Sequence, residues 1–460
     1  MSLRDDVIEI WKAGVDAVDS ARLVRSRVTL TRQTLTIGDR SVLLSDVNRV
    51  IVVGAGKAGA GMARGLEAAL ADLPPRIERV GFVNVPADCV ESLDWIHLHP
   101  ARPSGVNEPT EQAVVGTNRI LNLLSTARSG DVCILLLSGG GSALLCSPVA
   151  GISLADKLQV TRLLATAGAP IQDLNRVRTW LSNVKGGGLL NACGADRLTA
   201  LIISDVIGDP LPIIASGPTV PRDSTAHHAR RLLEQYVPDT AQLPDSVICH
   251  LKAAESGTMT QRQQTVHCSA VNVIIGNNQT AVLAAAHRAA ALGYDVVNDG
   301  SDHAGDAASE GSQFFRQLQQ LHGSGDDRQQ RICLIQGGEP TVRLANVPNV
   351  PATSRRGGRN QEFVLGMVSE FCYPEMWKGM AVLSGGTDGE DGPTDAAGAV
   401  ADAELIDGCL RKSLRPRDYL AVNNAYPFFR ELGGLLMTGP THTNVMDLRV
   451  GLKVYERSGV

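Results

Sequence analysis

The sequence predicts an α/β protein that folds as two domains. Its 460 residues exceed what one ordinary hydrophobic core accommodates, so a second domain is expected. Glycine is frequent, with 47 residues, and aromatic residues make up only 4%, a composition that suits tight turns between strands and helices. Apolar runs that end in turns of glycine, serine or aspartate recur along the chain. In open parallel sheets, ligands bind at such strand ends.

The first half of the chain alternates predicted strands and helices. Apolar residues at helical spacing predict a helix over 3–26, and weak alternation predicts a short hairpin over 28–47. The run 50–53 predicts a strand that enters a glycine turn and then a helix over 62–73. We expect further strands at 80–85, 95–98, 131–137 and 198–203, and helices at 110–127, 154–167, 175–183 and 222–252.

A polar stretch, 253–268, predicts a linker between a first domain of residues 1–255 and a second domain of residues 268–460. After it the alternation starts again. We expect strands at 271–275, 294–297, 332–335 and 380–383, and helices at 280–292, 305–321 and 363–371.

The first glycine turn admits two interpretations. Gly54, Gly56 and Gly59 match the spacing of a dinucleotide-binding turn, a weak signal when it stands alone. The next strand, however, offers no acid for a ribose before Asp88. Lys57 lies inside the turn and would add a point charge suited to phosphate. The P-loop pattern GxxxxGK[ST] is absent, which argues against the P-loop class of ATPases.

Other strand ends carry polar groups as well. The turn 138–142, Ser-Gly-Gly-Gly-Ser, is suited to holding a phosphate or carboxylate and lacks the pattern of a hydrolase nucleophile. Arginines and glycines at 355–359 precede a helix and predict an anion site. Hydroxyl and amide side chains gather in the late loop 438–444. Carboxylates suited to Mg²⁺ follow predicted strands at Asp205, Asp209, Glu339, Asp388 and Asp391.

Composition excludes several classes of protein. A net charge of −5 without a basic run argues against a nucleic-acid partner. No apolar run approaches the roughly 20 residues that span a bilayer, and the N-terminus is acidic where a signal peptide would be basic. Nine dispersed cysteines without CxxC pairs indicate a reducing compartment. We therefore expect a cytoplasmic protein that acts on a small molecule and does not bind a membrane. The sequence does not decide whether the protein forms a homodimer.

Taken together and in order, these stretches resemble the type II glycerate kinases, which combine a DUF4147 domain with a C-terminal MOFRL domain. The matching stretches cover nearly the whole chain: VGAGKA (53–58), SGGGSAL (138–144), NVKGG (183–187), SDVIGD (204–209), ASGPT (215–219), GGE (337–339), GGRNQE (357–362), GTDG (386–389) and DGPTD (391–395). The chain departs from the family pattern at Gly188, at His442 and after Pro100.

The resemblance implies phosphorylation of D-glycerate with ATP and Mg²⁺, in this family typically at the 2-hydroxyl. It also implies a Rossmann-like N-terminal domain with a parallel sheet, a smaller α/β C-terminal domain, and an active site in the cleft between them. By the same resemblance Lys57 and Arg359 act in phosphoryl transfer. We expect Asp205 to bind Mg²⁺ or help take the hydroxyl proton, and Asp388 to bind Mg²⁺.

We expect the substrate or phosphate groups to contact a wider set of glycines and polar residues: Gly54, Gly56, Ser138, Gly139, Gly140, Gly141, Ser142, Lys185, Glu339, Arg355, Gly358, Asn360, Glu362, Thr443 and Asn444. Two other functions remain open. An NAD(P)H-dependent hydroxypyruvate reductase would use the glycine turn for its cofactor, against which stand Lys57 and the missing ribose acid. A non-catalytic nucleotide-binding protein would bind ATP without turnover.

Overall fold

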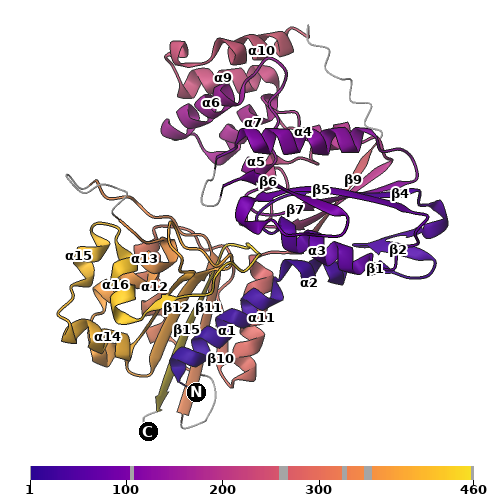
Figure 1. Ribbon diagram of the computed structural model, residues 1–460. Coiled ribbons are helices and arrows are strands. Elements are labelled where there is room, and N and C mark those ends of the chain that lie inside the picture. Colours follow the sequence, from indigo (N-terminus) through magenta and orange to yellow (C-terminus); the bar gives the residue numbers. More distant parts are fainter. Residues whose placement is uncertain (1, 104–107, 258–267, 324–328, 347–354, 457–460) are drawn as a thin grey trace. The chain divides into compact units, whose positions relative to one another are not determined.

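The computed structural model describes residues 2–103, 108–257, 268–323, 329–346 and 355–456 (Figure 1). The chain divides into two compact units. The N-terminal unit comprises residues 20–276, and the C-terminal unit comprises residues 1–19 together with 277–460. Within the described residues, no helix is both long and apolar enough to span a membrane.

The N-terminal unit is built on a sheet of six strands in the order β6-β5-β4-β7-β8-β9, with every neighbouring pair parallel. Its strands are β4 (Arg49–Ala55), β5 (Glu78–Pro86), β6 (Ile96–Arg102), β7 (Asp131–Leu137), β8 (Arg197–Ile203) and β9 (Ser269–Gly276). This is the order of a Rossmann sheet, in which the chain reverses direction across the sheet between β4 and β7. The carboxyl ends of β4 and β7 therefore flank the expected ligand position.

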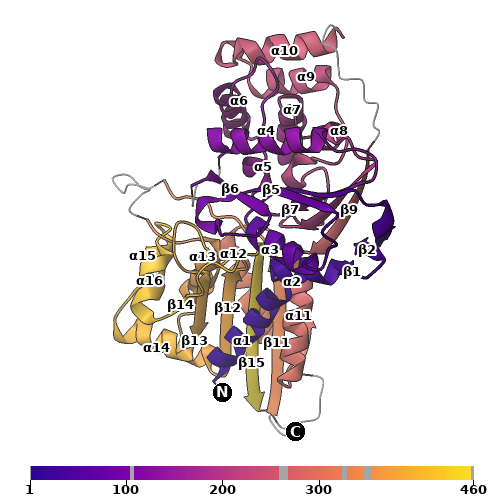
Figure 2. The ribbon, with the colours of Figure 1, turned by 45° about the vertical axis from the view of Figure 1, so that its right-hand side comes forward.

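Helices cover both faces of this sheet. Helix α3 (Gly59–Ala69) lies on one face beside α2 (Ser20–Arg27), and α4 (Glu111–Ser125) lies on the other, as Figures 1 and 2 show. Apolar side chains of β4, β7 and β8 form the core under α4. The remaining helices of this unit are α5 (Gly141–Leu144), α6 (Leu154–Thr166), α7 (Ile171–Trp180), α8 (Gly188–Ala192), α9 (Ala226–Tyr236) and α10 (Asp245–Glu255).

Helices α6, α7, α9 and α10 share an apolar core of their own, with Val160, Leu164, Val177 and Leu233 among its members. The predicted hairpin at 28–47 is confirmed, and a further strand extends it to an antiparallel sheet of three. Its strands are β1 (Val28–Leu30), β2 (Thr34–Ile37) and β3 (Arg40–Leu43).

The C-terminal unit contains a mixed sheet in the order β10-β11-β15-β12-β13-β14. Only β10 and β11 pair in parallel, and the other neighbours are antiparallel. The strands are β10 (Asp295–Asn298), β11 (Gln329–Gly338), β12 (Met380–Gly386), β13 (Gly398–Asp402), β14 (Leu435–Leu436) and β15 (Asp447–Glu456). The long strand β15 thus lies in the middle of the sheet although it is last in sequence.

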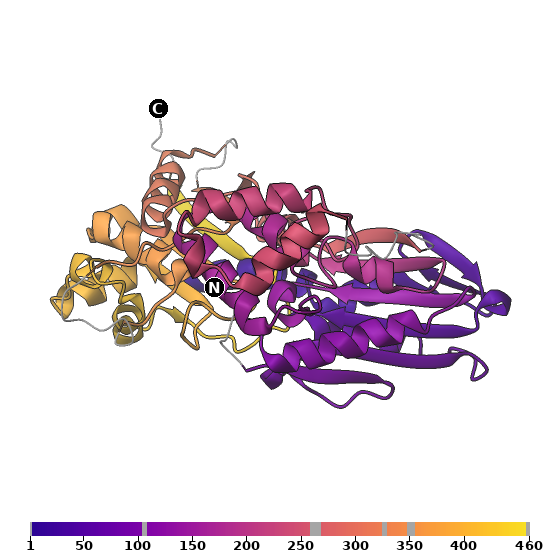
Figure 3. The same cartoon turned by 90° about the horizontal axis from the view of Figure 1, so that it is seen from above.

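Both faces of the mixed sheet are covered. Helices α1 (Leu3–Ala17) and α11 (Asn278–Ala291) pack on one face, and α12 (Ala307–Gln320) and α13 (Arg359–Glu370) pack on the other. Successive side chains of β11 point to opposite faces of the sheet. Leu334 packs in the core with α12 and α13, whereas Ile335 packs in the core with α1 and α11. Helices α14 (Ala403–Arg411), α15 (Pro416–Leu420) and α16 (Ala425–Leu432) complete the unit; Figure 3 shows the ribbon from above.

The unit boundaries differ from the expected 1–255 and 268–460 at two places. The helix expected over 3–26 is two helices: α1 packs its apolar face, including Trp11, in the C-terminal unit, whereas α2 belongs to the N-terminal unit. Strand β9, expected to open the second domain, pairs with β8 and completes the first sheet. Most of the expected linker, 258–267, lies outside the described residues.

Candidate functional site

The turn that follows β4 is fastened to the turn that follows β7. The backbone N–H of Lys57 donates to the carbonyl of Gly139 at 2.8 Å, and the N–H of Ala58 donates to Ser138 Oγ at 3.0 Å. The N–H of Gly56 donates to the carbonyl of Asn84 at 3.2 Å. These three donors are engaged by the protein itself. The turn therefore does not offer them to a pyrophosphate, unlike the turn of a dinucleotide-binding protein.

A glycine is required where the two turns touch. Gly56 has φ of 149°, and a Cβ there would collide with Ser138 Oγ. Gly54 also has no room for a side chain, because a Cβ would lie 2.5 Å from the carbonyl oxygen of Leu136. Both glycines thus serve the close approach of β4 to β7.

The side chains of Lys57 and Arg102 both pass beside Gly140 in the β7 turn. A Cβ on Gly140 would lie 3.4 Å from Cγ of Lys57 and 3.5 Å from Nη2 of Arg102. Arg102 ends β6 and is only 4% exposed, while Lys57 is partly exposed. Arg102 was not predicted as a site residue, because the sequence pattern ends this strand at residue 98 whereas β6 continues to Arg102. Both side chains lie at the edge where Rossmann sheets bind ligands.

Lys185 is fully buried and serves the scaffold beside this edge. Its Nζ donates to the carbonyl of Ser142 at 3.1 Å, the carbonyl of Ala215 at 3.3 Å and Ser216 Oγ at 3.2 Å. An ammonium has three N–H donors, so these partners use all of them. Burial, followed by the charges of Arg178 and Lys157, holds the pKa of Lys185 well below its ordinary value.

The loop that Lys185 holds has an unusual backbone. Ala215 and Ser216 adopt φ of 49° and 63°, in the left-handed region that is costly for residues with a Cβ. Gly141 and Ser142 open the short helix α5 beside this loop, and the Oγ atoms of Ser142 and Ser216 lie 3.1 Å apart. The hydroxyl of Ser142 therefore faces the strained loop.

Asp205 follows β8 and is partly buried. It lies at the same edge of the sheet as the β7 turn, because β7 and β8 are parallel neighbours.

In the C-terminal unit, Arg359 is clamped between two carboxylates. Its Nε and Nη2 donate to Asp447 at 2.7 and 3.0 Å, and its Nη1 donates to Glu339 at 2.6 Å. Strand β15 is antiparallel to β11 and β12, so its first residue, Asp447, pairs with their last residues, Gly338 and Gly386. This register brings together groups that are far apart in sequence.

The helix that carries Arg359 is capped by a buried acid. Asp391, 2% exposed, accepts hydrogen bonds from the backbone N–H groups of Asn360 and Gln361 at 3.0 and 2.8 Å. A Cβ on Gly358 would collide with this carboxylate, which explains the glycine. Burial raises the pKa of Asp391 to about 7, against the opposing effect of the two N–H donors.

Several acids surround Arg359 at this edge. Burial raises the pKa of Glu339, with the charges of Asp447 and Asp388 adding to it and that of Arg359 opposing it. Burial alone would lower the pKa of Arg359, but Asp447 and Glu339 outweigh it and raise this pKa. Asp447 also accepts from Asn360 Nδ2 at 3.0 Å. Within the described residues, no group of three or more acids, histidines or cysteines is arranged to hold a metal ion.

Four predicted residues have other contacts. Arg355 donates from Nη1 to the carbonyl of Ala345 at 2.6 Å, and the buried Glu362 accepts from Asn423 at 3.0 Å. Thr443 donates from Oγ1 to the carbonyl of Val18, at the end of α1, at 2.6 Å, and Asn444 accepts from the N–H of Met446 at 3.3 Å. These bonds secure loops. None of them reaches Arg359.

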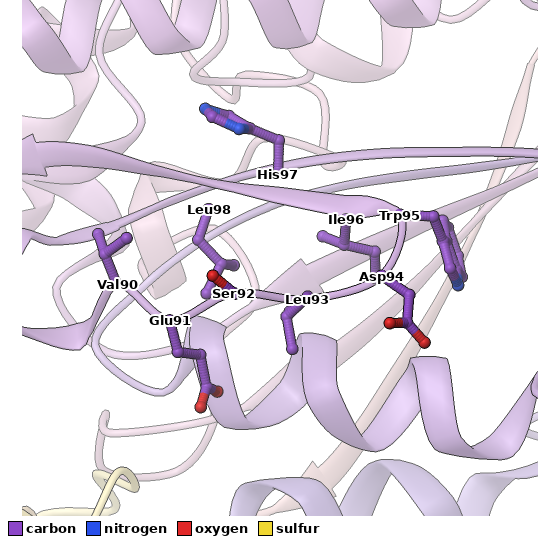
Figure 4. A pocket seen from close by; sticks show the side chains of 9 residues that line it. All are labelled: Val90, Glu91, Ser92, Leu93, Asp94, Trp95, Ile96, His97 and Leu98. Carbon is purple, nitrogen blue, oxygen red and sulfur yellow. The ribbon is translucent and has the colours of Figure 1, made fainter.

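A hollow of about 420 Å³ in the N-terminal unit is lined by residues 90–98 alone (Figure 4). Of its two acids, Glu91 and Asp94, the first pairs with Arg64 at 2.9 Å. Figure 4 shows His97 pointing to the opposite side of its strand from Leu98. None of the predicted site residues lines this hollow, and we assign it no function.

Comparisons with known proteins match both parts of the chain. A domain of unknown function, DUF4147, matches residues 6–252, and the MOFRL family matches residues 332–447. A glycerate kinase from Danio rerio is 34% identical and covers 98% of this chain and 98% of its own. A glycerate 2-kinase from Pyrococcus horikoshii is 31% identical, with 99% of each chain covered.

Solved structures agree with the sequence relatives. A glycerate kinase from Thermotoga maritima superposes with a TM-score of 0.78 at 31% identity, covering 98% of this chain and 99% of that chain. The two-domain α/β fold predicted from the sequence is confirmed. The cleft expected between the domains stays a prediction. With its DUF4147 and MOFRL domains and its full-length relatives, the chain belongs to the glycerate kinase family.

Proposed function

We propose that this protein is a kinase that uses ATP and Mg²⁺ to phosphorylate D-glycerate, with 2-phosphoglycerate as the product. The glycerate kinases that match nearly the whole chain support the reaction class. The name of the archaeal relative, glycerate 2-kinase, supports transfer to the 2-hydroxyl. The nine free thiols, all among the described residues, support a cytoplasmic location.

The observation that carries this proposal is the position of Lys57 and Arg102 beside Gly140, where the strand order reverses. Phosphoryl transfer requires positioning and neutralisation of the charge on the moving group, with little covalent chemistry from the protein. Lys57 provides an ammonium at the N-terminal end of α3, and Arg102 adds a planar donor fork. We assign to Lys57 the stabilisation of the transferred phosphoryl oxygens.

Arg359 keeps capacity for a ligand although it is clamped. A guanidinium has five N–H donors, and the three bonds to Asp447 and Glu339 use three of them. The side chain is 33% exposed, so the other two can reach a phosphate oxygen. Asp447 and Glu339 thus fix the orientation of Arg359 for this contact.

The acids at strand ends fit a magnesium ion, which takes oxygen ligands and is usually held by one or two carboxylates plus phosphate oxygens. Asp205 is the proposed ligand in the N-terminal unit. In the C-terminal unit, taken by itself, Asp388 is the proposed ligand, and Glu339, whose side chain is 43% exposed, is a further candidate. Bound Mg²⁺ would neutralise charge on the phosphate oxygens. We also keep Asp205 as a candidate to accept the proton of the substrate hydroxyl.

A coupled assay tests the reaction. ADP formation is measured with ATP, Mg²⁺ and D-glycerate, and loss of NADH is measured separately with hydroxypyruvate. We expect ADP formation that requires D-glycerate and stops with EDTA, and a ³¹P NMR signal of 2-phosphoglycerate. NADH oxidation without ADP formation would favour the reductase, and ATP binding without either would favour a non-catalytic protein. Against the reductase stand the engaged N–H groups of Gly56, Lys57 and Ala58.

A further inference from the structure

We propose that Arg178, held by Asn175 beside Ser216 and Ser142, binds the carboxylate of the small-acid substrate. This inference rests on the proposed function, for which it names the residue that recognises the acid. All four residues belong to the N-terminal unit, and Arg178 and Asn175 lie on helix α7.

The first support is a cluster of buried cations without acids. Lys157, 2% exposed, has Nζ at 3.5 Å from Cys146 Sγ, while Lys185 donates to neutral oxygens only. Burial lowers the pKa of Lys157, and the charge of Arg178 lowers it further. Among the described residues, neither lysine nor Arg178 forms an ion pair with an Asp or Glu. An anionic ligand would supply the missing negative charge.

The second support is the state of the Arg178 guanidinium. Its Nη1 donates to Asn175 Oδ1 at 3.2 Å, but its buried Nε has no hydrogen-bond partner among the described residues. Buried polar groups are normally hydrogen-bonded, so this donor is open to an acceptor that an acid substrate would supply. The residue as a whole is partly exposed, which leaves it accessible to a ligand.

A chain of hydrogen bonds ties Arg178 to the predicted site. Asn175 Oδ1 also accepts from Ser216 Oγ at 3.1 Å, and Ser216 Oγ lies 3.1 Å from Ser142 Oγ. Ser142 belongs to the glycine turn after β7, the turn beside which Lys57 and Arg102 both pass. The arginine is thus held in place at the edge where the reaction is proposed to occur, and Lys185 secures the same Ser216.

The shape of the Arg178 guanidinium favours a carboxylate over a phosphate as its ligand. A guanidinium presents parallel N–H donors that match the two oxygens of a carboxylate. Lys57 and Arg102 are already assigned to the phosphoryl group, so the substrate acid requires its own cation. A single carboxylate also brings one negative charge, which one guanidinium balances without the help of a metal.

Calorimetric titration of the full-length protein with D-glycerate, in the absence of nucleotide, tests the assignment. We expect Arg178→Gln to weaken D-glycerate binding about 10- to 100-fold, in proportion to the loss of a charge-assisted pair. The matched control is Arg176→Gln on the same helix, whose arginine pairs with Asp173 at 2.9 Å and with Asp223 at 3.5 Å. The control should bind D-glycerate like the wild type. Glycerol, which lacks the carboxylate, should bind weakly to both variants and to the wild type.

The outcomes separate this inference from the proposed function. Wild-type affinity for D-glycerate in a folded Arg178→Gln protein, or a wild type that binds no D-glycerate, overturns the assignment. A variant that loses ATP or inorganic phosphate binding but keeps D-glycerate binding also overturns it, in favour of a phosphate site. If D-glycerate binding is lost in the variant while the wild type forms no ADP, the site stands and the proposed function fails. If Arg178→Gln does not fold, Arg178→Lys is used in its place. We expect this variant to bind D-glycerate at least threefold more weakly than the wild type does. Unchanged affinity would overturn the assignment.

Discussion

Substituting Asp391 by asparagine should change how the stability of the C-terminal unit depends on pH. This carboxylate is buried against the first turn of α13, and burial raises its pKa from the ordinary 3.8 to about 7. In an unfolded chain the same group titrates near its ordinary value. Between about pH 4 and pH 7 the folded protein therefore holds a proton that the unfolded chain has lost.

The sign and size of the effect follow from linkage. Because the folded state binds more protons in this window, the free energy of unfolding falls as the pH rises from about 4 to about 7. At 1.36 kcal/mol per unit, the raised pKa corresponds to about 4 kcal/mol over the whole window. The amide of an asparagine cannot titrate, so the Asp391→Asn protein should lack this fall. The unfolding free energy of the variant minus that of the wild type should rise by about 4 kcal/mol between pH 4 and pH 8.

Urea unfolding at a series of pH values measures this difference. Trp11 and Trp377 report on the C-terminal unit once Trp95 and Trp180, which lie in the N-terminal unit, are replaced by phenylalanine. Asp395→Asn is the control, because that acid is exposed and the hydroxyl of Tyr426 lowers its pKa, so any effect appears below about pH 4 with the opposite sign. Parallel pH curves for the Asp391→Asn protein and the wild type, within ~1 kcal/mol, would refute the reasoning.

The remaining predictions concern the two strand-end sites. Gly56→Ala should destabilise the N-terminal unit by about 3 kcal/mol or more in thermal melting, because its Cβ meets Ser138 Oγ; a wild-type melting temperature would show that the turn can move apart. Arg359→Met should cost about 3 kcal/mol in urea unfolding, because it leaves the fully buried Asp447 without its cation, and it should also lower kcat. A variant with unchanged stability would mean that water or Asn360 replaces the guanidinium.

Local patterns predicted the first sheet well. The apolar runs at 50–53 and 131–137, each followed by a glycine turn, became the parallel strands β4 and β7, and their turns lie side by side as the Rossmann order requires. Which sheet a strand joins depends on a distant partner, so β9 was assigned to the second domain although it pairs with β8. Helix α1 was misplaced for the same reason, since its apolar face does not indicate which sheet it covers.

The prediction of site residues was also limited by contacts between residues that are distant in sequence. Asp447 escaped notice because β15, an antiparallel strand in the middle of the sheet, was not predicted, and only its register brings this acid to Arg359. Lys185 stood out in the sequence as a candidate ligand contact, but a sequence cannot reveal that its three donors are used by carbonyl and hydroxyl oxygens. Arg178 was not predicted as a site residue, because the sequence shows only that it lies in a helical stretch. Its lack of an Asp or Glu partner among the described residues is visible only in the structure.

The rate of D-glycerate phosphorylation by the Lys57→Ala protein tests the central claim most directly. Lys57 is assigned to the phosphoryl oxygens, and removing such a preorganised charge typically lowers kcat by about 100-fold or more. Lys252→Ala, in which an exposed lysine of the same unit is removed, is the matched control and should keep wild-type kcat. We predict this loss of kcat in a Lys57→Ala protein that melts like the wild type. Wild-type kcat in that folded protein would contradict the account.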